Sequence, residues 1–153
     1  MSTNTNQQQS QTTLQRVQEI GEMAGITLVQ HPSCDMLVCH FDMGGGRTQN
    51  VYIRHCGTTP DGQDVVCFMS PCMTLEKGFL KGMGKNQAID LLQRNAQLLF
   101  ARFAIQTLPD GDLLVVCSDQ IVDTMEVDEF KHHLFCVGGI ADNFEKEHGR
   151  DMF

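Results

Sequence analysis

The spacing of hydrophobic and polar residues changes along the chain and divides it into predicted helices and strands. Apolar residues between Leu14 and Ala24 recur every three or four positions, as on one face of a helix, and Gly25 is a natural stop. A second helix is predicted from about Gln87 to Thr107. The last helix is predicted from its apolar stripe, which comprises Val127, Phe130, Leu134, Val137, Ala141 and Phe144.

Segments of β-type composition lie between these predicted helices. Residues 35–43, 48–56 and 64–73 are separated by GGGR and GTTPDGQ, whose Gly, Pro and Asp residues favour turns. Residues 112–118 form a further predicted strand, and Ile121 with Val122 could form a short fifth one. The order helix, three strands, helix, two strands, helix predicts an α+β domain, with a single antiparallel sheet of four to five strands and three helices. We expect the first and last helices to cover one face of that sheet.

The polar composition at the start of the chain predicts the domain boundaries. Residues 1–12 contain no apolar residue after Met1, and such a segment cannot offset the entropy lost on ordering. We therefore expect a disordered tail over 1–12, a single domain over 13–148 and a short C-terminal tail over 149–153.

The predicted second helix has apolar residues on two sides. One broad band, expected to face the sheet, comprises Ala88, Leu92, Ala96, Leu99, Phe100 and Phe103. Leu91, Leu98 and Ile105 are spaced by seven and form a narrow seam on nearly the opposite side. This seam predicts either packing against another helix of the same chain or a homodimer interface with a second copy.

Charge and composition exclude several classes of partner. The formal net charge is −8, and the eleven Lys and Arg residues are scattered, which argues against a nucleic-acid partner. No apolar run is long enough for a membrane helix. The seven cysteines are irregularly spaced and the N-terminus has no signal-peptide pattern, so we expect a cytoplasmic protein without disulfides.

The cysteines and histidines offer candidate metal or redox chemistry. Two pairs, Cys34 with Cys39 and Cys67 with Cys72, have the same spacing, but Cys39 and Cys67 fall within predicted strands and are interpreted as small core residues. His132 and Cys136 share one side of the last helix, where we expect a partly exposed polar flank. The GMGKN segment lacks the residues of a phosphate-binding loop. We therefore predict no catalytic residues, no metal and no cofactor.

Several short stretches resemble, in order, the bacterial sensory-transduction-regulator (YbjN-type) and type III secretion chaperone-like family: GRTQNVYI, MSPC, LLQRNAQLLFARFAI followed by DGDLLVV, and VDEFKHHLFCVGGIADNFEKE. The resemblance covers roughly residues 14–147. The positions that carry it are Arg47, Val51, Ser70, Pro71, Asn95, Phe100, Phe103, Ala141 and Asp142. It implies a small acidic domain, often dimeric, that binds protein segments without catalysis.

The resemblance and the residues together predict a chaperone-like or regulatory adaptor that binds a segment of a partner protein. The acidic charge suits a basic or amphipathic client, and the exposed edges of a sheet can accept an added strand. The alternative is a cysteine-based metal-binding or redox-sensing protein.

Overall fold

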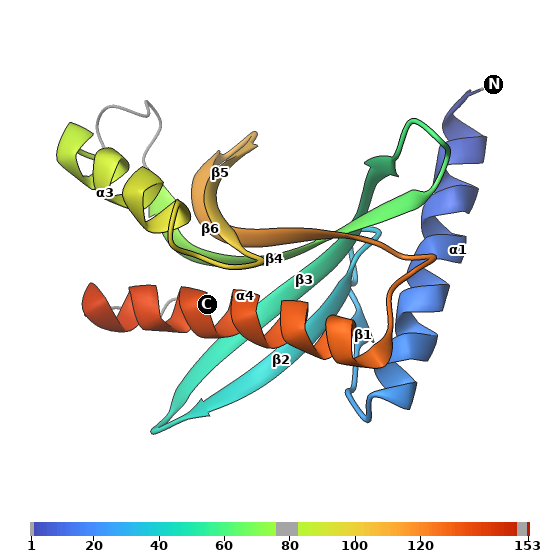
Figure 1. The fold of residues 1–153 in the computed structure, drawn as a ribbon, viewed down its shortest axis with the longest axis horizontal. Helices are drawn as coiled ribbons and strands as arrows, with labels where there is room; N and C mark the ends of the chain where they lie inside the picture. Colours follow the sequence, from blue (N-terminus) through green and yellow to red (C-terminus); the bar gives the residue numbers. More distant parts are fainter. Residues whose placement is uncertain (1, 76–82, 150–152) are drawn as a thin grey trace.

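The fold is an α+β arrangement built on one antiparallel sheet (Figure 1). The computed structural model describes residues 2–75, 83–149 and 153. Its elements, in chain order, are α1 (Ser2–Met23), β1 (Val29–Gln30), β2 (Leu37–Gly44), β3 (Arg47–Thr58), β4 (Asp64–Leu75), α3 (Lys85–Asn95), β5 (Arg102–Leu108), β6 (Gly111–Ile121) and α4 (Val127–Glu147). The predicted fold class is confirmed, with six strands in place of four or five.

The strands lie in the order β1-β2-β3-β4-β6-β5, and every neighbouring pair is antiparallel. The predicted turn at Gly44–Gly46 joins β2 to β3, and all three glycines adopt positive φ, which side chains disfavour. The proposed short strand at Ile121 and Val122 is not separate, because Ile121 is the last residue of β6. β1 and β5 form the two edges of the sheet.

One face of the sheet is covered by α1 and α4, as predicted. The α4 stripe packs into the main core, where Phe130, Leu134 and Val137 are fully buried. α1 contacts both β3 and α4 and contributes Leu14 and Val17 to the same core. α4 is further stabilised at its start by a capping box, which satisfies backbone groups that a helix end leaves unpaired. Figure 1 shows α1 and α3 at opposite ends of the molecule.

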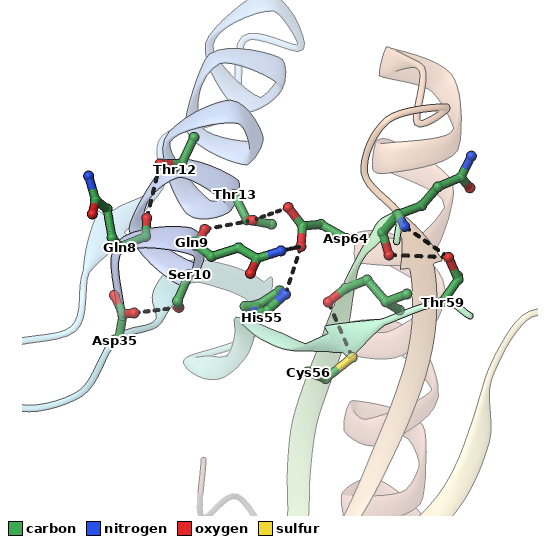
Figure 2. A network of polar contacts seen from close by, with 12 residues as sticks. Gln8, Gln9, Ser10, Thr12, Thr13, Asp35, His55, Cys56, Thr59 and Asp64 are labelled. Carbon is green, nitrogen blue, oxygen red and sulfur yellow. Dashed lines mark hydrogen bonds and ion pairs between the residues drawn. The ribbon is translucent and has the colours of Figure 1, made fainter. Parts of the chain in front are cut away.

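The N-terminal segment differs from its prediction. α1 begins at Ser2, so residues 2–12 belong to a helix, where a disordered tail was expected. Figure 2 shows how polar contacts hold this polar helix. Asp64, at the start of β4, accepts hydrogen bonds from Gln9 Nε2 and Thr13 Oγ1, both at 2.8 Å, and contacts His55 Nε2 at 3.1 Å. Composition missed this helix because its partners are about fifty residues away in the chain.

The second helix also differs from its prediction. It ends at Asn95, and residues 102–108 form the edge strand β5, so the predicted helix from Gln87 to Thr107 is wrong in its second half. The chain turns at Phe100, which has a φ of 65°, a left-handed conformation that is uncommon for a bulky residue. The predicted broad band therefore does not face the sheet as a unit, and Leu92, Leu99 and Phe100 are exposed.

Candidate functional site

Two of the residues that carry the sequence resemblance, Arg47 and Asp142, join the sheet to α4. Arg47, at the start of β3, donates from Nε to Asp142 Oδ1 at 2.9 Å, and its Nη2 lies 3.6 Å from Glu145 Oε2. Lys146 Nζ lies 2.6 Å from the other Asp142 oxygen. Burial opposes ionisation of Asp142, but hydrogen bonds from Lys146 and Arg47 outweigh it and lower the pKa of this carboxyl. The cluster is a largely buried ion network that holds α4 on the sheet.

A second set of these residues supports the centre of the sheet. Gln49 Nε2 donates to Ser70 Oγ at 2.8 Å and to the Pro71 carbonyl at 3.0 Å, so it ties β3 to the bulge in β4. Val51 and Ala141 are fully buried in the core. These positions serve packing and hydrogen bonding within the fold.

Asn95 closes part of the sheet's edge. Its Nδ2 donates to the Phe103 carbonyl at 3.0 Å, and its Oδ1 accepts the Phe103 N–H at 2.7 Å. The Asn95 amide therefore pairs with β5 as a neighbouring strand would. The Phe103 ring packs against Phe144 of α4 with centroids 5.4 Å apart, which places α3, β5 and α4 together.

The predicted seam does not exist as one helical face. Leu91 lies on α3 and is buried, Leu98 lies in the following turn and packs against the core, and Ile105 lies on β5 with 39% of its surface exposed. The seam required a helix through Ile105, and α3 ends ten residues earlier. A homodimer stays a prediction, without this seam as its interface.

Exposed apolar residues gather on α3, the turn after it and β5. They are Ile89, Leu92, Leu99, Phe100, Ile105 and Leu108. An apolar pocket of about 250 Å³ lies beside them, lined by Met83, Ala88, Leu91, Leu92, Asn95, Phe103, Ala104, Ile105 and Leu114. Surface residues of this kind, adjoining an apolar pocket, are typical of interaction sites.

The backbone of β5 also has free hydrogen-bonding capacity at this place. Asn95 bonds to both polar backbone groups of Phe103, so these groups point away from β6. In an antiparallel strand, the backbone groups of every second residue point to the same side. Ile105 and Thr107 therefore direct their N–H and C=O groups to the outer edge, where no other described residue forms a hydrogen bond with them.

A separate polar pocket of about 550 Å³ lies next to the turn at Phe100. It is lined by Phe100, Arg102, Ser118, Asp119, Gln120, Asp128, Glu129, His132 and His133. Ser118 Oγ donates to the Phe100 carbonyl and lies 2.7 Å from His133 Nδ1. The Ser118 hydroxyl therefore lies between the Phe100 carbonyl and the His133 ring. Burial also lowers the pKa of His133, and neighbouring His132 adds to this. These contacts join the turn at Phe100 to β6 and α4.

The predicted cysteine pairs do not come together. Cys34 is exposed, whereas Cys39 and Cys72 are buried in the main core. Cys67 is buried as predicted, but it belongs to a second apolar cluster with Val115 and Cys117, apart from the main core. Within residues 2–75, 83–149 and 153, no three His, Cys, Asp or Glu side chains are grouped to hold a metal ion.

The predicted flank on α4 has the expected position. His132 Nε2 lies 3.6 Å from Cys136 Sγ, and His132 is exposed while Cys136 is partly exposed.

The described helices include none that is long and apolar enough to cross a membrane.

Comparisons with known proteins support a relationship at the level of the fold. No known protein family matches the sequence, and no curated protein is significantly similar to it. Among solved structures, the chain is similar to YbjN from E. coli, whose description proposes a role in transcription regulation. The two share 14% sequence identity with a TM-score of 0.57, over 89% of this chain and 91% of YbjN. The chain thus has a YbjN-like fold, as the resemblance in sequence implied.

Proposed function

We propose that this chain is a non-catalytic, protein-binding adaptor that binds an extended segment of a partner protein along β5. The observation that carries this proposal is the coincidence of an open strand edge with an apolar pocket. Ile105 contributes to both, since its backbone groups point to the outer edge and its side chain lines the pocket.

The binding step is addition of a strand to the sheet. Ile105 and Thr107 offer two N–H donors and two C=O acceptors, and an extended segment can pair with all of them. The Asn95 amide already forms hydrogen bonds with the backbone N–H and C=O of Phe103, so an added strand can pair only with the second half of β5. An apolar side chain of the segment would enter the pocket beside α3, which gives selectivity in addition to backbone pairing.

The charge of the chain favours a basic or amphipathic segment. The formal net charge is −8, and an acidic surface attracts cationic partners and repels acidic ones. An adaptor of this kind accords with the regulatory role proposed for YbjN and with the chaperone-like resemblance in the sequence.

The test compares two variants of one residue as baits in an extract of the native cells. Thr107→Pro removes an outward N–H without touching a hydrogen bond to β6, and Thr107→Ala keeps that N–H while removing the side chain. We expect one or more proteins to be enriched by wild type and Thr107→Ala and to be lost with Thr107→Pro. Equal capture by all three baits, with each shown to be folded, would contradict binding at this edge.

Homodimerisation is proposed separately, from the resemblance to a family that is often dimeric. Sedimentation equilibrium of the purified chain tests it directly. A mass near 34 kDa, twice the 17.1 kDa of one chain, supports a dimer, and a mass near 17.1 kDa across micromolar concentrations contradicts it.

A further inference from the structure

The face of the sheet opposite α1 and α4 carries a group of sulfur atoms that the proposed binding site does not use. Cys67 and Met69 alternate on β4 and therefore point to the same face. Met69 lies directly opposite Cys117 of β6 in the register of the sheet. Cys67 and Cys117 also belong to one buried cluster, and Met69 packs against it. Two thiols and one thioether thus meet across two central strands.

Two arginines flank this sulfur group from the outer neighbours. Arg54 of β3 lies directly opposite Cys67, and Arg102 of β5 lies directly opposite Cys117. Arg102 also forms an ion pair with Asp119, which lies directly opposite Cys67 on β6. The face that carries the sulfur atoms therefore holds two positive charges and one negative charge.

Apolar side chains surround the sulfur atoms, together with Asp119, which lies directly opposite Cys67. Cys67 and Cys117 are each 6% exposed, and Val115 beside them is 2% exposed. Ala104 and Leu113 pack against the same cluster. A small, nearly dry site with sulfur donors suits a soft cation, because harder ions such as Mg²⁺ and Ca²⁺ require oxygen ligands.

We propose that Cys67, Cys117 and Met69 bind one copper(I) ion. Copper(I) accepts two thiolates and a thioether in low coordination, whereas structural zinc takes four ligands. Binding exchanges one Cu⁺ for two thiol protons and leaves a complex with one negative charge, which balances the net positive charge of Arg54, Arg102 and Asp119. This proposal does not depend on binding of a protein segment at β5.

A disulfide between the same two cysteines is a poorer fit to the sheet. Cys67 pairs with Asp119 and Cys117 pairs with Met69, so the two cysteines are diagonal neighbours. The Cα atoms of diagonal neighbours lie roughly 7–8 Å apart. Disulfides require Cα atoms within about 7 Å, so a bond here would need movement of two central strands.

The test is an anaerobic titration of the fully reduced full-length chain with copper(I) in competition with bicinchoninate. We expect wild type to withdraw one copper(I) per chain, and Cys67→Ser and Cys117→Ser each to lose this binding. Met69→Leu should weaken it by at least about tenfold, since even the loss of a group that only supports a metal ligand costs that much. Cys34→Ser with Cys136→Ser is the matched control, because both thiols lie outside the sulfur group, and it should bind as wild type does.

Circular dichroism and thermal unfolding of each variant establish that it is folded before titration. Failure of wild type to compete for copper(I) would overturn the proposal, whatever the variants do. So would unchanged binding by folded Cys67→Ser and Cys117→Ser chains, which would place the copper on other thiols.

Discussion

Replacement of Asn95 by Ala tests how the edge of β5 is held. Asn95→Ala removes one hydrogen bond to the Phe103 N–H and one to its carbonyl, at 2.7 and 3.0 Å. Phe103 is 8% exposed, so water cannot fully replace either bond. A polar group left unsatisfied in this way costs about 1–3 kcal/mol, and the two together should lower the free energy of unfolding by about 2–4 kcal/mol. In a domain of this size, each kcal/mol lowers Tm by about 2–4 °C.

Urea denaturation followed by circular dichroism measures this effect, with Gln93→Ala as the control. Gln93 is exposed on the same helix, so its replacement should change the free energy by no more than about 0.5 kcal/mol. Hydrogen exchange at the Phe103 amide gives a local check, since its protection should fall in Asn95→Ala. A free energy for Asn95→Ala within 0.5 kcal/mol of wild type would refute the reasoning that the Asn95 amide acts as a short strand.

Two further predictions concern α4 and the ion network. Gly139→Ala should stabilise the chain by about 0.5–1 kcal/mol, because Ala favours a helix more than Gly does and the added Cβ meets nothing within 4 Å. A Cβ added at Gly138 would instead lie 3.2 Å from Val51 Cγ2. Gly138→Ala should therefore be less stable than Gly139→Ala by about 1–3 kcal/mol in thermal unfolding, and equal stability would be inconsistent with close packing of α4 on β3. The folded pKa of Asp142 lies below its unfolded value of about 3.9, so its contribution to stability is present above that pH and is lost as pH falls through the folded pKa. Asp142→Asn should thus have a lower free energy of unfolding than wild type at pH 7. Between pH 7 and pH 3 its free energy of unfolding should fall by less than that of wild type. An equal fall in both chains would show that Asp142 does not contribute.

Most of the fold could be predicted from local patterns. The strands from 35 to 73 and the stripe on α4 follow simple periodicities of two and of three to four residues, and the turn glycines mark where strands end. The error at the second helix has a physical cause. Residues 96–105 contain no Gly or Pro, so nothing local stops a helix after Asn95. The helix ends because Asn95 binds the backbone of Phe103 and because β5 pairs with β6, and neither contact is visible in a helical periodicity.

The candidate site depends even more on contacts distant in the sequence. The positions that carry the resemblance include Arg47, Asp142, Asn95 and Phe103. In the structure Arg47 bonds to Asp142, 95 residues away, and Asn95 bonds to Phe103, 8 residues away. Alternation correctly grouped Cys67 with Met69, but it could not tell which face of the sheet they share. That face, and the position of Cys117 opposite Met69, depend on strand order and register.

Hydrogen exchange along β5 is the most direct test of the central claim that a partner segment adds to this edge. The measurement compares the backbone amides of the free chain with those of the chain bound to the segment captured by wild type. We expect strong new protection at Ile105 and Thr107 and little change at Ala104 and Gln106, whose amides already pair with β6. Unchanged exchange at Ile105 and Thr107, with new protection at β1 or on α1, would contradict it.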